Sequence, residues 1–172
     1  NHIAQADEYL LTDTPEKWDF EHDSFLNAMK TAFVLYGWIN EVGEDELMEK
    51  YGVTPGGIRA KQDRADWLIY ASQELCKLKD MNKVIKRLKK LRLRLKHGIK
   101  KELLPLIDFK GIGRVRARTL FDAGYKTTED VKNATQEELK SLPGIGNKIS
   151  QVAEGKHESK IEKEEGSSGQ SS

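Results

Sequence analysis

The chain has 172 residues and a mass of 19.6 kDa, which leaves room for one medium domain or two small ones. Hydrophobic residues make up 37% of the chain, charged residues make up 33%, and the formal net charge is +1. No apolar run approaches the roughly 18 residues of a membrane-spanning helix and no signal-peptide pattern opens the sequence, which argues against a membrane-embedded or secreted protein.

The charges are segregated along the chain. Residues 1–50 contain 3 Lys/Arg and 12 Asp/Glu, residues 51–120 contain 19 and 6, and residues 121–172 contain 7 and 10. A basic middle block of this size is typical of a protein with a polyanionic partner, although it could also pair with the acidic first block. The single cysteine, Cys76, cannot form an internal disulfide, which favours a cytoplasmic setting. Because the sequence does not begin with Met, we expect a fragment of a longer protein.

The first helix is predicted after an acidic opening segment. Residues 1–22 contain Pro15 and little periodicity, so we expect them to be irregular or to form a short helix. A helix should run from Asp23 or Ser24, both good N-caps, to about Asn40. Its apolar residues recur at spacings of three and four and predict one buried face: Phe25, Met29, Ala32, Phe33 and Tyr36.

Two more helices follow, each with a clear boundary signal. Residues 44–51 should form a short helix that ends at Gly52. Thr54 and Pro55 then predict the N-cap and first turn of a helix that extends to about Lys79.

The next helix should begin after Asn82 and end at His97-Gly98. Four apolar residues spaced by four, three and four predict a packed seam: Val84, Leu88, Leu91 and Leu95. Eight basic residues lie between them: Lys83, Lys86, Arg87, Lys89, Lys90, Arg92, Arg94 and Lys96. These side chains are either a solvated face or a surface that meets phosphates. No strand pattern appears anywhere, so we predict an all-α fold.

A short helix at residues 100–106 should lead into a repeated pattern. Residues 106–121 read LIDFKGIGRVRARTLF, and residues 139–153 read LKSLPGIGNKISQVA. The turns Gly111-Ile112-Gly113 and Gly144-Ile145-Gly146 lie 33 residues apart and have similar apolar flanks. One such turn would be a weak signal, but two in register predict a tandem of helical hairpins.

The glycine turns suit phosphate binding. Glycine adopts positive φ and lets the backbone approach a ligand closely, while the isoleucine should insert between the helices. The amide groups at the start of the second helix then point outward, where the helix dipole adds partial positive charge. Such a nest holds a phosphate, directly or through a cation, without contacting a base, so binding should be largely independent of sequence.

The two hairpins differ in their basic residues. Arg114, Arg116 and Arg118 follow the first turn directly, but arginines two apart diverge around a helix. We expect one or two of them to bind DNA and another to hold a neighbouring domain. The second turn is followed only by Asn147 and Lys148, and it could instead be a packing repeat that completes the small core.

Several segments together resemble the C-terminal end of the archaeal Hjm-type superfamily II DNA helicases, relatives of eukaryotic HELQ. These segments are FLNAMKTAFVLYGWINE (25–41), YGVTPGGIRAKQDRADWLIYA (51–71), LKHGIKKELLPL (95–106) and GIGRVRARTLF (111–121). The resemblance implies a helical bundle called the ratchet domain, followed by a helix-hairpin-helix domain. It also implies an enzyme that moves 3′ to 5′ on single-stranded DNA at stalled replication forks, driven by ATP.

The resemblance also implies roles for single residues. The helix after Pro55 is similar to the family's ratchet helix, and Trp67 matches its base-stacking tryptophan, although a core tryptophan is the alternative reading. Arg59, Lys61 and Arg64 are the basic candidates on that helix, but Ala60 stands where some members carry a second arginine. Arg116-Ala117-Arg118 matches an Arg-Ala-Arg motif that links the last domain to DNA and to the motor.

The motor motifs of such an enzyme are not found in this sequence. It contains neither GxxxxGK[ST] nor Asp-Glu-x-His, which ATP hydrolysis needs to hold Mg²⁺ and phosphates. We therefore expect a chain without catalytic residues, cofactor or metal, with ATP and Mg²⁺ bound by upstream motor domains. The scattered histidines and Cys76 have no metal-ligand spacing.

We divide the chain into residues 1–98 (ratchet-like bundle), 99–156 (tandem helix-hairpin-helix domain) and 157–172 (a disordered charged and Gly/Ser-rich tail). The expected partners are single-stranded and forked DNA, the motor domains, and replication or repair proteins near the nucleoid. The expected DNA-binding residues are Arg59, Lys61, Arg64, Trp67, Gly111, Ile112, Gly113, Arg114, Arg116, Arg118, Gly144, Gly146 and Lys148. Two alternatives remain: a tandem-hairpin module of a structure-selective nuclease, and a duplex-reading regulator that uses residues 46–61 as a helix-turn-helix.

Overall fold

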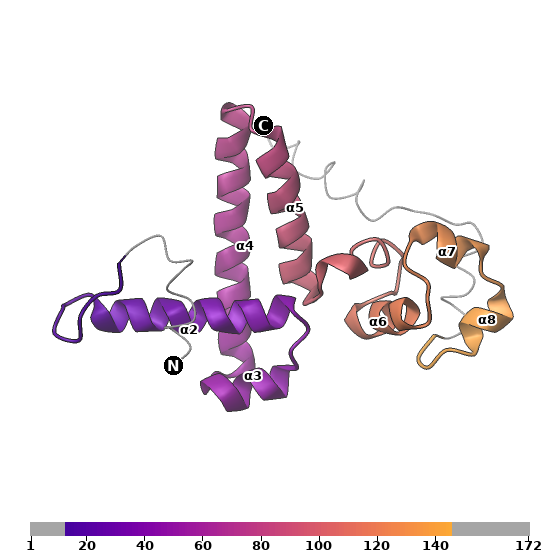
Figure 1. Cartoon of the computed structure of the whole chain (residues 1–172), viewed down its shortest axis with the longest axis horizontal. Helices are drawn as coiled ribbons and strands as arrows, with labels where there is room; N and C mark the ends of the chain where they lie inside the picture. Colours follow the sequence, from indigo (N-terminus) through magenta and orange to yellow (C-terminus); the bar gives the residue numbers. More distant parts are fainter. Residues whose placement is uncertain (1–12, 146–172) are drawn as a thin grey trace, which may run out of the picture.

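The computed structural model describes residues 13–145 of the chain, and this part is helical without any strand (Figure 1). The all-α prediction is therefore confirmed. Residues 1–12 and the predicted tail at 157–172 lie outside the described part. The elements are α2 (His22–Ile39), α3 (Glu44–Tyr51), α4 (Pro55–Leu78), α5 (Asn82–His97), the 3₁₀ helix η2 (Lys101–Leu103), α6 (Arg114–Asp122), α7 (Thr128–Asn133) and α8 (Gln136–Lys140).

The first four of these helices form one packed unit. Figure 1 shows α4 and α5 side by side as a long hairpin. In the same view, α2 crosses α4, and α3 lies beneath α2. Val34, Leu47 and Ile58 form the buried centre where α2, α3 and α4 meet, and Trp38 packs against them. The Trp38 indole Nε1 also donates a 2.7 Å hydrogen bond to the carbonyl of Leu95, which ties α2 to the end of α5.

The helix boundaries follow local sequence signals. The hydroxyl of Thr54 accepts a hydrogen bond from the Gly57 amide at 3.1 Å, and Pro55 occupies the first helical position. Gly52 and Gly98 end α3 and α5 in the left-handed conformation, with φ of +56° and +62°. These predicted boundaries are confirmed.

The start and the buried face of α2 differ from the prediction. The helix begins at His22, its N-cap is Glu21, and no side-chain cap forms, so neither Asp23 nor Ser24 caps it. Tyr36, placed on the buried face, is 67% exposed, and Val34 is buried instead. Residues two apart point to opposite sides of a helix, so α2 turns a different face inward than its apolar spacing predicted, and its crossing over α3 and α4 decides which face that is.

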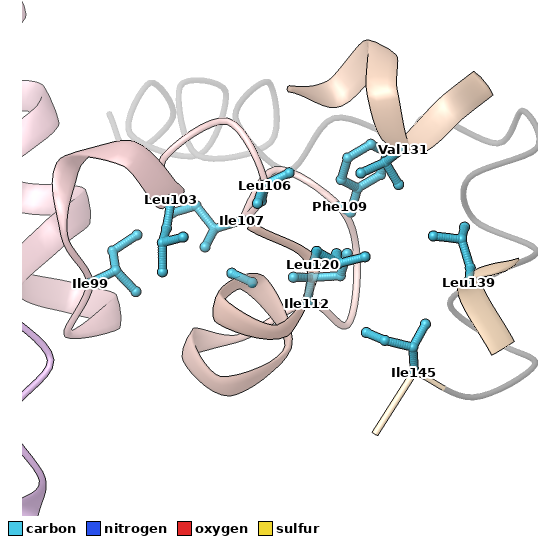
Figure 2. Close-up of a cluster of buried hydrophobic side chains, with 11 residues drawn as sticks. Ile99, Leu103, Leu106, Ile107, Phe109, Ile112, Leu120, Val131, Leu139 and Ile145 are labelled. Carbon is cyan, nitrogen blue, oxygen red and sulfur yellow. The ribbon is translucent and has the colours of Figure 1, made fainter. Parts of the chain in front are cut away.

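The remaining elements share a second core, at the other end of the molecule. Figure 2 shows Ile112 and Ile145, one from each glycine turn, directed into the same cluster as Leu120 and Leu139. The predicted insertion of the isoleucines is therefore confirmed. The buried members are Ile99, Leu103, Leu106, Ile107, Phe109, Ile112, Ala117, Leu120, Val131, Leu139 and Ile145.

The connection into this core is tighter than predicted. Instead of a helix over residues 100–106, the chain forms a 3₁₀ turn at Lys101–Leu103 followed by further turns. Pro105 explains the difference, because within a helix its ring would meet the carbonyl of Lys101. Further along, Thr127 with Asp130 and Thr135 with Glu138 form capping boxes that begin α7 and α8.

Candidate nucleic-acid interface

The first glycine turn has the geometry of a helical hairpin. Gly111 has φ of +86°, which favours glycine. Ile112 is buried, and its amide donates to the carbonyl of Phe109 at 3.1 Å. Gly113 is extended and serves as the N-cap of α6. Both glycines are exposed to solvent.

The first turn of α6 presents open amide groups. Ala117 donates to the carbonyl of Gly113 at 2.9 Å, as a regular helix requires. Within residues 13–145, the amides of Gly113, Arg114 and Val115 donate to no acceptor. Val115 is 76% exposed, so solvent reaches this end of the helix. The hairpin therefore offers free donors at the positive end of a helix dipole.

The second glycine turn is described only in part. Gly144 has φ of +74° and is exposed, and Ile145 is buried. Gly146 and Lys148, together with Asn147, lie outside the described residues. Like Ile112 of the first turn, Ile145 is buried in the second core.

Arg116 joins the two turns. Its Nη1 donates to the carbonyl of Gly111 at 2.8 Å, and its Nε donates to the carbonyl of Gly144 at 2.9 Å. The planar guanidinium suits such a bridge, because its donors are held in a rigid fork. The Arg116 side chain thus positions the glycine turns relative to each other.

Arg114 reaches away from the hairpin toward α2. Its Nη2 donates to the carbonyl of Val42 at 2.9 Å, and its guanidinium carbon lies 5.3 Å from the centre of the Trp38 ring. Burial lowers the pKa of Arg114, although the nearby charge of Glu41 raises it. The residue stays charged, as arginine does in proteins.

Arg118 makes the densest set of ionic contacts in this region. Its Nε and Nη2 each donate to a carboxylate oxygen of Glu41 at 2.8 Å. Further contacts reach Glu102 at 3.1 Å and Asp122 at 3.5 Å. The hydrogen bond to Glu41, with those to the other carboxylates, raises the pKa of Arg118.

Glu41 is the acceptor at the centre of this joint. It follows α2 with φ of +69°, an uncommon conformation for a residue other than glycine. It also accepts a hydrogen bond from the Lys100 amide at 2.8 Å. Burial, the largest influence, raises the pKa of Glu41, but the hydrogen bonds and charges of Arg118 and Lys100 outweigh it and lower the pKa below 4.5.

Arg114 and Arg118 therefore join the hairpin unit to the end of α2. The sequence suggested that one arginine holds a neighbouring domain, but it did not identify Trp38, Val42 or Glu41 as the contacts. Arg118 and Glu41 are 77 residues apart. Glu41 is unusual in its positive φ. No local sequence pattern predicts that conformation, so the sequence did not identify Glu41 as the partner of Arg118.

The candidate ratchet helix α4 carries an exposed aromatic residue. Trp67 is 65% exposed and lies outside both hydrophobic cores, which contradicts the alternative reading as a core tryptophan. Arg64 lies one turn before it on the same face. Arg59 and Arg64 are exposed, Lys61 is half-buried, and none of the three forms an ion pair within the described residues.

Six of the basic residues of α5 fall into two groups. Arg92 forms two hydrogen bonds with Asp66, at 2.8 and 2.7 Å, and ties α5 to α4. Arg94 donates to the carbonyls of Ile39 and Ile99. Four others are exposed and share one face of the helix, at spacings of three and four: Lys83, Lys86, Arg87 and Lys90.

Two other features are absent from residues 13–145. No group of three His, Cys, Asp or Glu lies close enough to hold a metal ion there. None of the helices in this range is long and apolar enough to cross a membrane.

Comparison with known proteins gives two family matches. Residues 1–98 match the family "Archaeal helicase, domain 4", and residues 103–151 match the family "SAM-like helix-hairpin-helix tandem". The second match covers both glycine turns.

Among the curated relatives are three proteins named ATP-dependent DNA helicase Hel308. That of Pyrococcus horikoshii is 47% identical over 133 residues, covering 77% of this chain and 18% of the relative. That of Pyrococcus abyssi is 46% identical over 133 residues (76% and 19%), and that of Caldivirga maquilingensis is 43% identical over 149 residues (86% and 19%). The chain thus spans less than a fifth of the length of each of these relatives.

Proposed function

Because the chain belongs to the family of archaeal helicase domain 4, we propose that it is the non-catalytic, DNA-gripping part of an ATP-dependent DNA helicase. The whole enzyme would move 3′ to 5′ along single-stranded DNA at stalled replication forks. Upstream motor domains would bind ATP and Mg²⁺ and hydrolyse the nucleotide. The protein would act in the cytoplasm near the nucleoid, beside replication or repair proteins.

The observation that carries this proposal is the exposed face of α4. Trp67 stands on it with Arg64 one turn away and without an acidic partner for Arg64 among the described residues. An exposed aromatic ring beside cations is the arrangement that binds single strands, because bases stack on the ring while cations attract the backbone. Such stacking contributes about 1–3 kcal/mol per base.

The hairpin unit supplies a second contact in this proposal. The open amides at the start of α6 would hold a phosphate without reading a base. Arg116 supports that contact by fixing both glycine turns. Of the predicted arginines, Arg114 and Arg118 would act mainly as the joint to the bundle, since Arg114 donates to the carbonyl of Val42 and Arg118 donates to the carboxylate of Glu41.

These contacts suggest a division of the chain. Residues 1–98 would form the ratchet-like bundle, and residues 99–156 would form the hairpin domain, with the joint at Glu41 between them. The proposed DNA-binding set keeps Arg59, Lys61, Arg64 and Trp67 on α4 and the turn residues of the first hairpin. The second turn, with Gly144, Gly146 and Lys148, would contribute a further phosphate contact.

Competition binding tests the proposal against its two alternatives. A labelled single strand is first bound to the chain. Unlabelled single strands, forks, four-way junctions and duplexes of different sequence are then added, and the concentration of each that displaces the labelled strand is measured. The helicase module should prefer single strands and forks. A preference for junctions would favour the nuclease module, and a preference for one duplex sequence would favour the regulator.

The salt dependence of single-strand binding gives a second readout. If about four phosphates are neutralised, the logarithm of the association constant should fall against the logarithm of salt concentration with a slope near −3. A flat response would contradict a grip on the DNA backbone.

A further inference from the structure

A groove runs between α2 and α4, and Arg64, one helical turn before Trp67 on α4, is among its lining residues. It has a volume of about 620 Å³ and is open to solvent. Its polar lining comes from both helices: Asn27, Lys30 and Thr31 from α2, and Lys61 and Arg64 from α4. The remaining lining side chains are apolar. No residue of α2 was expected from the sequence to contact DNA.

The charge of the groove is one-sided. Three cations line it and no carboxylate does, although α2 and α4 both carry acidic residues elsewhere, such as Asp23 and Asp63. Within residues 13–145, neither Lys30 nor Lys61 forms an ion pair. A concave surface with unpaired cations attracts anions more strongly than a flat surface does, because low-dielectric walls focus the field.

The neutral lining adds hydrogen-bonding groups. Asn27 and Thr31 are four residues apart, so they lie on the same face of α2, one turn after the other. An amide and a hydroxyl both donate to phosphate oxygens, and contacts of this kind fix the position of a nucleic-acid backbone. The groove therefore combines charge with directed donors.

We propose that this groove binds the phosphodiester backbone of single-stranded DNA next to the base that stacks on Trp67, with Lys30 as a DNA contact on α2. The inference rests on the proposed function and deepens it. Lys61, Arg64 and Trp67 follow one another at three-residue intervals, which spans about 9 Å along the helix. The strand would thus pass from the groove onto the aromatic ring, held by α2 on one side and α4 on the other.

The open shape favours a polymer over a small anion. A nucleotide or free phosphate is usually enclosed by a pocket with convergent donors, whereas this groove opens to solvent and is lined by Arg64, one helical turn from Trp67. Inorganic phosphate and ATP share the same phosphate chemistry, so they serve as competing probes. They should displace a bound oligonucleotide only at concentrations where their ionic strength alone weakens binding.

The test compares Lys30→Ala with Lys79→Ala, an equal change of charge at an exposed lysine outside the groove. Binding of a fluorescent single strand to the 172-residue chain is followed by anisotropy at several salt concentrations. Lys30→Ala should weaken binding about fivefold, as for one exposed charge contact. It should also make the salt slope shallower by about 0.7, the value for one phosphate on a single strand. Lys79→Ala should change neither the affinity nor the salt slope. Lys30→Arg should bind with the affinity and the salt slope of the unsubstituted chain.

Each outcome separates this inference from the proposed function. If Lys30→Ala binds like the unsubstituted chain while Trp67→Ala binds weakly, the groove is not a DNA site and the proposed function stands. If the unsubstituted chain shows no salt-dependent binding of single strands, the proposed function fails, and the groove inference fails with it. If ATP or phosphate displaces the oligonucleotide at matched ionic strength, the groove is a small-anion site and the inference is overturned. Melting followed by circular dichroism checks that the variants are folded.

Discussion

Substitution of Arg118 by alanine tests the joint between the bundle and the hairpin unit. The change removes two 2.8 Å hydrogen bonds to Glu41 and the 3.1 Å contact with Glu102. Among residues 13–145, the Glu41 carboxylate, whose side chain is 13% exposed, then keeps only the Lys100 amide as a hydrogen-bond donor. We expect the free energy of unfolding to fall because a largely buried charge loses its counter-ion.

The expected size of the loss lies between two limits. Exposed ion pairs contribute about 0.2–1 kcal/mol, whereas removing one partner of a fully buried pair costs about 3–5 kcal/mol. The Arg118 side chain is 28% exposed, so the pair is closer to buried than to exposed but still partly solvated. We therefore expect a loss of about 2 kcal/mol, or a decrease in Tm of about 4–8 °C for a chain of this length.

Urea unfolding and thermal melting, followed by circular dichroism, measure this loss. The matched control is Arg87→Ala, which removes an exposed arginine without an ion pair in the described part of the chain and should change stability by less than about 0.5 kcal/mol. A double-mutant cycle with Glu41→Gln should give a coupling of about 1–2 kcal/mol. If Arg118→Ala is no more destabilising than Arg87→Ala, or if the coupling is near zero, the joint does not stabilise the fold as argued.

Three further predictions concern the same structure. Trp67→Ala should weaken single-strand binding by about 1–3 kcal/mol without lowering Tm; a large loss of Tm with unchanged binding would place its role in folding. Arg116→Lys keeps the charge but cannot bridge two carbonyls in the same way, so calorimetry should show a loss of about 1 kcal/mol; a stability equal to that of the unsubstituted chain would contradict the bridge. The pKa values of Glu41 and Glu102 are lowered from their ordinary value, so the stabilisation from these carboxylates is present at pH values above the unfolded-state pKa and is lost as the pH falls through the folded-state pKa. Tm should therefore decrease more steeply between about pH 5 and pH 3 in the unsubstituted chain than in Arg118→Ala, and parallel curves would refute this link.

Local signals in the sequence were enough to identify most helices. Thr54 and Pro55 begin α4, and Gly52 and Gly98 end their helices, because capping and left-handed turns depend on residues a few positions apart. The repeated Gly-Ile-Gly turns and the buried isoleucines were predictable for the same reason. The family was also recognisable from short segments, which the match over residues 1–98 confirms.

Contacts between distant parts of the chain were not predictable in this way. The spacing of apolar residues on α2 allowed Tyr36 to be placed inward, and the packing of neighbouring helices put Val34 there instead. The same holds for the groove beside Lys30, which exists only because α2 crosses α4.

The sequence by itself thus determined the helical composition, the helix ends and the paired glycine turns, since each arises from interactions within a few residues. Only the tertiary structure decided what the basic residues do. It directs Arg118 to Glu41, Arg116 to the carbonyls of both turns, and leaves Trp67 exposed. The physical reason is that a side chain's partner depends on where whole helices pack, and a periodic pattern along one helix carries no information about the position of another.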